Sequence, residues 1–335
     1  MGKQERFFFD VDADLQVMSG KTLAVIGYGN QGRSQALNMT DSGLNVIIGG
    51  QRDATLEQAT EDGFDVMPVA EAAKRADAVF ILVPDEIMPT VYEEQVAPHM
   101  LDNQMVIFAS GYNVYYGLIV PAPSLDVVLL APRMIGKGVR DRFVSGHGYP
   151  ALIAVNQDGS GQAWPKLLSL AKGIGATKMG ALESSFEEET ILDLFNEQAM
   201  CGVQLWAFRT AFEILNSYGL NPSAILLELY ASGEPEQIAR AYTDLGIWDQ
   251  LKLHSRTSQF GQLTRARLGA GPELRAHMTK IVEELRDGSF AREWASEQNV
   301  GFPGLHRMQA LVAEHESYRA EKRLFEMMKN KTDKC

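Results

Sequence analysis

A short apolar run that ends in a glycine-rich turn constrains the fold of this chain more than any other stretch. Residues Thr22-Leu-Ala-Val-Ile-Gly27 predict a strand, and the turn Gly27-Tyr28-Gly29-Asn30-Gln31-Gly32 leads into a helical pattern that reaches Met39. In this setting the first glycine permits the turn, the second lets a pyrophosphate approach the backbone, and the third allows close packing. The sequence therefore predicts a Rossmann-type domain that binds a dinucleotide through this turn.

The loop after the second predicted strand, residues 45–48, bears on the choice between NADPH and NADH. No acid stands directly at the end of this strand, where NAD-specific sites usually hold the ribose hydroxyls. Arg52 and Thr55 could hold a 2′-phosphate, whereas Asp53 would repel one. The loop favours NADPH over NADH, and the alternative is an ordinary polar loop.

The pattern of the remaining chain separates two domains. Further N-terminal strands and helices are predicted at 68–75, 78–83, 85–95, 105–109 and 127–131. Beyond Glu183 the β-branched runs stop, and helices are predicted at 186–217, 222–232, 234–253, 256–268, 271–287, 289–298 and 304–329. We therefore expect a Rossmann-type domain over 1–182, an all-α domain over 183–329 and a tail over 330–335.

Composition limits the possible partners and compartments. The net charge of -12 argues against nucleic acid, because proteins that bind the phosphate backbone usually present a clustered basic surface. The longest apolar runs are strand-sized, so no membrane association is expected. Two cysteines, Cys201 and Cys335, make no disulfide framework and fit a reducing compartment, which leads us to expect a cytoplasmic protein.

Two acids at the start of the helical half suggest a metal site. Asp193 and Glu197 stand one helical turn apart, and oxygen ligands at this spacing suit Mg²⁺. On spacing alone a solvated acidic face is the commoner explanation. The neighbouring acids 187–189 fit that explanation better, because acids in a first helical turn are favoured by the helix macrodipole.

These motifs, taken together, resemble the short, class I type of ketol-acid reductoisomerase, and the similarity runs nearly end to end. The motifs that carry it are Phe9-Asp10-Val-Asp12-Ala-Asp14-Leu15, the glycine turn, Val83-Pro84-Asp85-Glu86, Pro150-Ala-Leu-Ile-Ala-Val155, Ala171-Lys-Gly-Ile-Gly175, Phe186-Glu-Glu-Glu-Thr190, Asp193-Leu-Phe-Asn-Glu-Gln198 and Gly288-Ser-Phe-Ala-Arg-Glu-Trp294. The resemblance implies a Rossmann domain, a helical domain that interlocks with its copy in a homodimer or higher oligomer, NADPH and Mg²⁺. It also implies a two-step reaction, in which alkyl migration in a 2-aceto-2-hydroxy acid precedes reduction by a hydride.

The resemblance also assigns roles to individual residues. Asp193, Glu197 and Glu228 match the metal-site acids, and Ser255 matches a serine that holds the substrate carboxylate. Further positions implied to contact the cofactor are Pro84, Asp85 and Gly136.

Several catalytic positions depart from the family pattern. Ser110 replaces an active-site histidine, Arg133 replaces an active-site lysine, and Ser232 stands where a second acid would follow Glu228. Lys137 and Gln259 replace a histidine and a glutamate. The change at 133 matters because lysine can give up a proton whereas arginine stays charged. Losing one carboxylate also lowers the charge that holds a second Mg²⁺.

Three functions follow from this pattern of kept and lost residues. We expect first an NADPH-dependent reductase that reduces a small 2-keto or imino acid, held by Ser255 and Arg133, with the alkyl-migration step lost or altered. The first alternative is a true ketol-acid reductoisomerase that converts 2-acetolactate to 2,3-dihydroxyisovalerate in valine and isoleucine synthesis. The second is a catalytically silent dinucleotide-binding protein.

Overall fold

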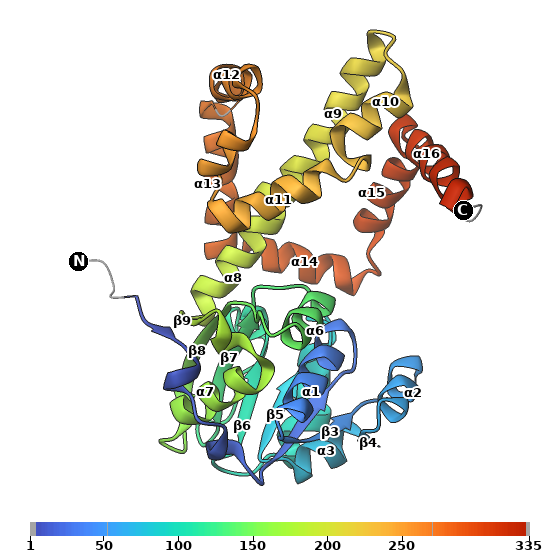
Figure 1. The fold of residues 1–335 in the computed structure, drawn as a ribbon. Helices are drawn as coiled ribbons and strands as arrows, with labels where there is room; N and C mark the ends of the chain where they lie inside the picture. Colours follow the sequence, from blue (N-terminus) through green and yellow to red (C-terminus); the bar gives the residue numbers. More distant parts are fainter. Residues whose placement is uncertain (1–4, 52, 270, 333–335) are drawn as a thin grey trace. The chain divides into compact units, whose positions relative to one another are not determined.

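The chain divides into two compact units, residues 1–192 and 193–335. The structure is a computed structural model that describes residues 5–51, 53–269 and 271–332 (Figure 1). The first unit is built around a β-sheet, whereas the described residues of the second form helices and their connections without a strand. The expected α/β Rossmann-type domain followed by an all-α domain is therefore confirmed.

The sheet of the first unit has nine strands among the described residues, in the order β1-β9-β8-β7-β6-β5-β2-β3-β4. The strands are β1 (Phe7–Phe8), β2 (Thr22–Ile26), β3 (Asn45–Gly49), β4 (Asp65–Met67), β5 (Ala78–Ile81), β6 (Met105–Phe108), β7 (Asp126–Pro132), β8 (Ala151–Asp158) and β9 (Ala181–Glu183). From β4 to β7 all neighbours are parallel, whereas β8 pairs with β7 antiparallel. The parallel part has the doubly wound strand order of a Rossmann fold, which reverses between β2 and β5.

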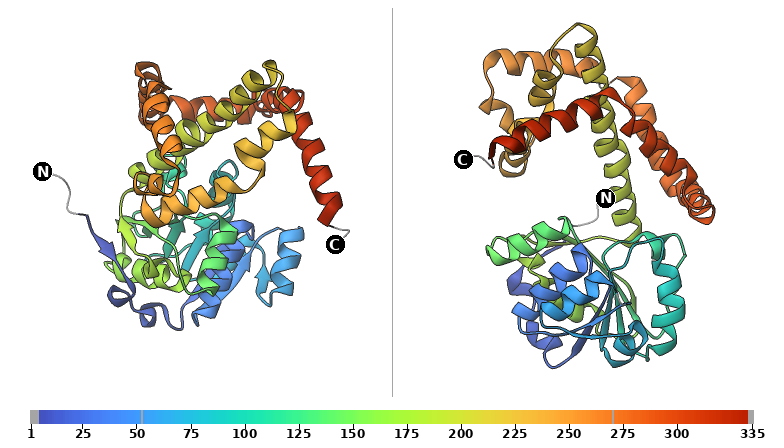
Figure 2. Two further views of the ribbon diagram at one scale, coloured as in Figure 1. Left: turned by 45° about the horizontal axis from the view of Figure 1, so that its top comes forward. Right: turned by 90° about the vertical axis from the view of Figure 1, so that its right-hand side faces the viewer.

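Helices cover both faces of this sheet, and that explains why its central strands are continuous apolar runs. The helices of this unit are α1 (Asn30–Asp41), α2 (Ala54–Glu61), α3 (Val69–Arg75), α4 (Met88–Val91), α5 (Tyr112–Tyr115), α6 (Gly136–Val144) and α7 (Ala163–Ile174). Residues of α1 and α7 pack on one face, and those of α3 and α4 on the other. Figure 2 shows the blue α1 and the teal α4 on opposite sides of the sheet. Strands buried on both faces need no polar alternation.

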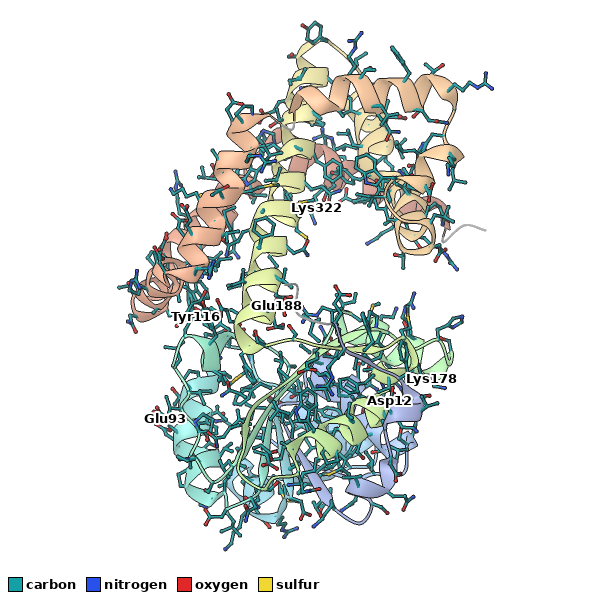
Figure 3. The ribbon with its side chains drawn as sticks, turned by 90° about the vertical axis from the view of Figure 1, so that its left-hand side faces the viewer. Asp12, Glu93, Tyr116, Lys178, Glu188 and Lys322 are labelled. Atoms are coloured by element: carbon teal, nitrogen blue, oxygen red, sulfur yellow. The ribbon has the colours of Figure 1, made fainter. Side chains whose placement is uncertain are left out.

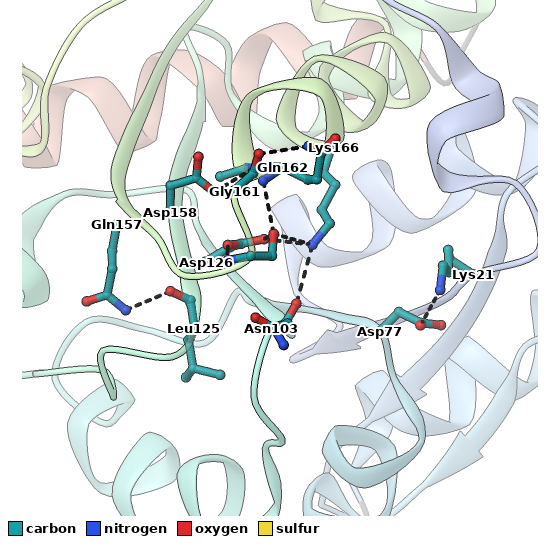
Figure 4. Close-up of polar contacts among 12 residues, drawn as sticks. Lys21, Asp77, Asn103, Leu125, Asp126, Gln157, Asp158, Gly161, Gln162 and Lys166 are labelled. Atoms are coloured by element: carbon teal, nitrogen blue, oxygen red, sulfur yellow. Dashed lines mark hydrogen bonds and ion pairs between the residues drawn. The ribbon is translucent and has the colours of Figure 1, made fainter.

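A buried ion pair fixes the start of β7. The Asp126 carboxylate is fully buried and accepts hydrogen bonds from Lys166 Nζ at 2.7 Å, from Ser160 Oγ at 2.7 Å and from the Ser160 amide at 2.8 Å. Lys166 also donates to the carbonyl oxygen of Asn103 at 3.3 Å (Figure 4). These bonds join β7, the β8–α7 turn, α7 and the loop before β6 in one network. The network lies at the amino end of β7, away from the strand ends that bind ligands in such folds.

The second unit consists of helices and short helical turns. Its helices, with α8 beginning in the first unit, are α8 (Phe186–Phe195), α9 (Gly202–Ser217), α10 (Pro222–Leu226), α11 (Glu234–Leu245), α12 (Arg256–Arg265), α13 (Pro272–Arg286), α14 (Ser289–Asn299), α15 (Pro303–Ala313) and α16 (Glu316–Thr332). The π-helical segment η6 (Asn196–Cys201) joins α8 to α9, and a second, η7 (Leu227–Ala231), follows α10.

Two predicted helices of this unit were drawn too long. The helix predicted over 304–329 is two helices, α15 and α16, with a break at residues 314–315. The helix predicted over 234–253 stops at Leu245, because Gly246 takes a left-handed φ of 84°. A 3₁₀ turn over 249–253 then follows.

The second unit buries little of its apolar surface. Its two described clusters of buried apolar side chains hold five and three residues, Phe212, Ile225, Leu226, Ala320 and Leu324, and Ala199, Ile281 and Leu285. Large side chains such as Trp248 and Phe260 are 72% and 64% exposed. An apolar surface of this kind usually marks an interaction site.

Within the residues that the structure describes, no helix combines the length and the apolar character needed to cross a membrane.

Candidate cofactor and metal sites

The three glycines of the turn after β2 have three different surroundings. Gly27 has a φ of 93°, and a Cβ there would lie 2.9 Å from the Leu82 carbonyl oxygen. A Cβ on Gly32 would lie 2.0 Å from the Gly27 oxygen, whereas a Cβ on Gly29 would have no atom within 4 Å. Gly29 also caps the amino end of α1. The open space at this glycine, at the amino end of α1 where the first N–H groups of a helix have no partner within it, fits a pyrophosphate.

The loop before α6 lies against the glycine turn. Gln31 Nε2 donates a hydrogen bond to the Met134 carbonyl oxygen at 2.9 Å. A Cβ on Gly136 would lie 2.3 Å from the Asn30 carbonyl oxygen, so only glycine permits this approach. The structure therefore brings Asn30, Gln31 and Gly136, three of the residues predicted to contact the cofactor, into one place.

The ends of β5 and β6 are held together by Asn113. Its Nδ2 atom donates to the carbonyl oxygen and to the Oδ1 atom of Asp85, both at 3.1 Å. Pro84 precedes Asp85 and is exposed. Burial and, next, the charge of Asp85 raise the pKa of Tyr112 to about 12. Tyr116, which Figure 3 labels, packs its ring edge-on against Tyr112 with centroids 4.9 Å apart. The end of β5 borders the point between β2 and β5 where the strand order reverses, and ligands bind beside this point in Rossmann folds.

The loop after β3 lines a cavity of about 1100 Å³ formed with β4, α2 and the residues around Pro68. Asp53 caps α2, since its Oδ1 atom accepts hydrogen bonds from the Thr55 amide at 2.9 Å and the Thr55 hydroxyl at 2.7 Å. The Thr55 hydroxyl and the capped amides hold the pKa of the Asp53 carboxyl below its usual value. Thr55 is therefore joined to the acid that would repel a 2′-phosphate. Arg52 lies outside the described residues.

Glu189 links two loops that were predicted to carry catalytic residues. It is 1% exposed, and its two carboxylate oxygens accept hydrogen bonds from Arg133 Nη2 and from the Gly111 amide, both at 2.7 Å. Ser110, beside Gly111, accepts a hydrogen bond from the Tyr112 amide through its Oγ atom at 3.3 Å. The guanidinium of Arg133 is thus held by a buried carboxylate.

Sequence reasoning missed Glu189, because three acids in a first helical turn were attributed to the helix macrodipole. That explanation suits Glu187 and Glu188, which are exposed, as Figure 3 shows for Glu188 on α8. Glu189 shares its face of α8 with the buried Phe186 and Thr190. Helical spacing from Phe186 was the available signal, because residues three and four apart share a face.

Two of the three predicted metal acids lie in π-helical segments, and the third lies in the helix just before one. Asp193 is in the last turn of α8, Glu197 is in η6, and Glu228 is in η7. Desolvation and, next, the negative charge of Asp193 raise the pKa of Glu197 above its usual value. Two carboxylates that repel each other in this way fit a cation. Among the described residues of one chain, however, no three His, Cys, Asp or Glu side chains form a group that could hold a metal.

Ser255 stands at the amino end of α12. Its Oγ atom accepts a hydrogen bond from the Ser258 amide at 3.2 Å, so it caps this helix. A serine hydroxyl that accepts one bond still has a proton to donate, as a substrate carboxylate would require. Gln259, at the position of the family's glutamate, donates to the His254 carbonyl oxygen at 2.8 Å.

The strand order, the open Gly29 and the strand-end loops define the first unit as the nucleotide-binding domain of a dinucleotide-dependent oxidoreductase. Family models give the particular group. Residues 17–180 match the NADPH-binding domain of acetohydroxy acid isomeroreductase, and residues 186–330 match the C-terminal domain of ketol-acid reductoisomerase. The chain belongs to the ketol-acid reductoisomerase family.

Individual relatives agree with this assignment over nearly their whole length. A Saccharolobus solfataricus protein with the provisional name ketol-acid reductoisomerase 3 is 45% identical over 96% of this chain and 98% of its own. The NADP⁺ ketol-acid reductoisomerase of Methanocaldococcus jannaschii is 40% identical over 92% of this chain and 94% of its own. The solved structure of an NADH-preferring ketol-acid reductoisomerase from an uncultured archaeon has a TM-score of 0.91 and 34% identity, covering 96% of this chain and 98% of its own.

Proposed function

We propose that this chain catalyses the complete ketol-acid reductoisomerase reaction, from a 2-aceto-2-hydroxy acid to a 2,3-dihydroxy acid. The observation that carries this proposal is the similarity over both domains to relatives named as NADP⁺ ketol-acid reductoisomerases, at 40–41% identity. These names support the complete reaction better than the uncoupled reductase that the sequence analysis put first. The retained Asp193, Glu197, Glu228 and Ser255 support it as well.

Each part of the site has a role in this reaction. When bound, NADPH supplies the hydride and Mg²⁺ polarises the substrate oxygens. The amides after Gly29 hold the cofactor pyrophosphate, and Asp85 and Gly136 line the cofactor path. Asp193 and Glu197 hold the metal, while the Ser255 hydroxyl donates to the substrate carboxylate. Glu189 orients Arg133, whose fixed positive charge attracts the anionic substrate.

We propose further that the active protein is a homodimer in which Glu228 of a second copy completes the metal site. The support is twofold. The described part of one chain does not gather three acids, and the helical unit leaves large apolar side chains exposed. A symmetric dimer would bury part of this surface and form two equivalent sites.

NADPH is the proposed hydride donor. The family model describes the matched region as NADPH-binding, and relatives at 40–41% identity carry NADP⁺ in their names. The Asp53 carboxylate in the cofactor cavity favours NADH instead, and the similar solved structure belongs to an NADH-preferring protein. Residual use of NADH is therefore expected.

The second candidate is a reductase of the same family that has lost the migration step and binds one Mg²⁺. The bond between Arg133 and the buried Glu189 favours it, because a guanidinium held in this way cannot take part in proton transfer as a lysine can. Ser232, exposed at the end of η7, offers no carboxylate for a second ion.

Two substrates distinguish the candidates. At saturating NADPH and Mg²⁺, rates are compared for 2-acetolactate and for 3-hydroxy-3-methyl-2-oxobutyrate, the already rearranged intermediate. Similar rates support the complete reaction. Turnover of the intermediate alone would replace it with the uncoupled reductase, and turnover of neither would point to another keto or imino acid. Asp193→Asn serves as the control, because it removes a proposed metal ligand and should abolish both reactions.

A further inference from the structure

The carboxylate of Asp62 joins the glycine turn to α2, the helix that follows the loop after β3. Asp62 Oδ2 accepts hydrogen bonds from the Tyr28 hydroxyl at 2.8 Å and from Arg33 Nε at 2.7 Å. Its Oδ1 atom accepts from Arg33 Nη2 at 3.0 Å and from Gln58 Nε2 at 3.2 Å. The Asp62 side chain is only 14% exposed. Four bonds from three side chains make this the most heavily bonded acid near the cofactor turn.

The bonding partners belong to three elements. Tyr28 is the second residue of the glycine turn, is 4% exposed and packs edge-on against Phe64 with ring centroids 5.7 Å apart. Arg33 is on α1, and Gln58 is on α2. Asp62 is the C-cap of α2, and Asp53, the N-cap of the same helix, lines the cavity beside the loop after β3. Because α2 is eight residues long, its two ends are about 12 Å apart.

An acid at the position of Asp62 would by itself destabilise α2. An acid at the carboxyl end of a helix opposes the macrodipole, and α2 has no basic residue in its last turn. The bidentate bond from Arg33 compensates, and it also holds the pKa of the Asp62 carboxyl below its usual value. The helix has one fully buried side chain, Ala59. Ala59 and the partly buried Leu56 give α2 its apolar contacts with the core, and the Asp62 bonds add the polar contacts that join it to α1 and the glycine turn.

From these contacts we infer that Asp62 is a positioning residue for the adenosine half of the dinucleotide. By joining α2 to the glycine turn, it sets the distance between the pyrophosphate site at Gly29 and the loop that receives the adenosine ribose. The inference rests on the proposed binding of NADPH and deepens it. Asp62 acts through α2 and the loop and does not itself touch the cofactor.

The test divides the cofactor into halves and uses the full-length protein. Calorimetry gives the Kd of NADPH, of adenosine 2′,5′-bisphosphate and of reduced nicotinamide mononucleotide. In Asp62→Asn, the Kd of NADPH and of the bisphosphate should each rise about tenfold, because a bidentate charged bond is lost. The Kd of the mononucleotide, which lacks adenosine, should not change. A purely structural role would not separate the two halves.

Two further variants serve as a second test and as a matched control. Tyr28→Phe keeps the ring on Phe64 and removes one of the four hydrogen bonds to the Asp62 carboxylate, so the same two Kd values should rise about threefold. Asp65→Asn makes the same chemical change as Asp62→Asn at an exposed acid three residues away and should leave all three Kd values unchanged. Circular dichroism and melting temperature establish that each variant is folded.

Two outcomes overturn the inference. Either an unchanged Kd for NADPH in both Asp62→Asn and Tyr28→Phe, or a mononucleotide Kd that rises as much as that of the bisphosphate, would do so. If the unmodified protein binds neither NADPH nor the bisphosphate, the proposed function fails at its cofactor step, and the role of Asp62 falls with it.

Discussion

Asp53 provides a prediction about cofactor choice. Replacing it with serine removes a negative charge from the cavity beside the loop after β3, the proposed place of the adenosine ribose, and retains a good N-cap for α2, since serine caps helices about as well as aspartate does. NADPH affinity should rise about three- to tenfold, because an exposed like charge no longer faces the 2′-phosphate. Affinity for NADH should stay the same or fall. Kd values for both cofactors, measured at low and at high salt, check this, and the gain should shrink at high salt.

Glu189 provides a prediction about stability. Glu189→Gln removes the charge that pairs with Arg133, so the free energy of unfolding should fall by about 2–4 kcal/mol, as for other broken buried pairs. Glu188→Gln is the matched control at an exposed neighbour and should change it by less than about 0.5 kcal/mol. Urea titration measures both. Equal effects of the two substitutions would show that the Arg133 pair contributes little.

At the scale of single residues, the sequence predicted the features that depend on local backbone conformation. The glycine turn follows from φ values and close approaches that only glycine allows, and these are local properties of the chain. Glu189 was missed, since its burial depends on loops that are more than fifty residues away in sequence. Ser255, Glu228 and the other predicted site residues stay predictions until their ligands are measured.

Among the secondary-structure elements, the network at the start of β7 should make stability depend on pH. Burial opposes ionisation of Asp126, but the bonds from Lys166 and Ser160 outweigh it and hold the pKa of its carboxyl below the usual value. A depressed folded-state pKa stabilises the fold at pH values above the unfolded pKa, and the gain is lost as pH falls below about 4.

Asp126→Asn tests this pH dependence. At pH 7 the variant should be less stable by about 2–3 kcal/mol, and the difference from the unmodified protein should narrow as the pH is lowered from 5 to 3. Asp41→Asn, which breaks a more exposed pair with Arg140 in the same unit, should cost less than about 1 kcal/mol. Thermal melts across this pH range give both comparisons. A difference that is constant with pH would contradict the assignment to ionised Asp126.

Several central strands were predictable because they are apolar throughout, whereas the longer β8 and α7 were not predicted as elements. The strands at 78–83 and 105–109 were found because strands buried on both faces are continuous apolar runs. Strands β4 and β9 have three residues each, too few to show a period, and they exist because a neighbouring strand pairs with them. The break between α15 and α16 was not predicted, because residues 314–315 include no glycine or proline.

Considering the whole molecule, a shared metal site predicts complementation between inactive chains. If Asp193 and Glu228 of one site come from different copies, a dimer of one Asp193→Asn chain and one Glu228→Gln chain has one intact site and one doubly altered site. Coexpression of the two variants should therefore restore about a quarter of the unmodified activity, given random pairing. Each variant expressed alone should be inactive. Failure to restore activity in purified mixed dimers would place both acids in one chain.

Fold class was predictable at this scale, because strand and helix periodicities separate the two halves of the chain. Assembly was predicted only through the family resemblance, which implies a homodimer. The residues that a second copy would cover could not be read from the sequence, since only the structure shows that one chain leaves Trp248 and Phe260 exposed.

The close contact at Gly32 distinguishes a glycine that the fold requires from one that only ligand binding requires. Since a Cβ there would lie 2.0 Å from the Gly27 oxygen, Gly32 is required by the backbone whether or not a nucleotide is ever bound. A related protein that had lost catalysis would still need glycine at this position in order to fold. Gly29 has open space around it, so a side chain there would clash only with a bound ligand. Gly32→Ala should abolish folding, while Gly29→Ala should fold normally and lose NADPH binding. In genomes, a side chain at position 29 would therefore be the first sign of a silent relative.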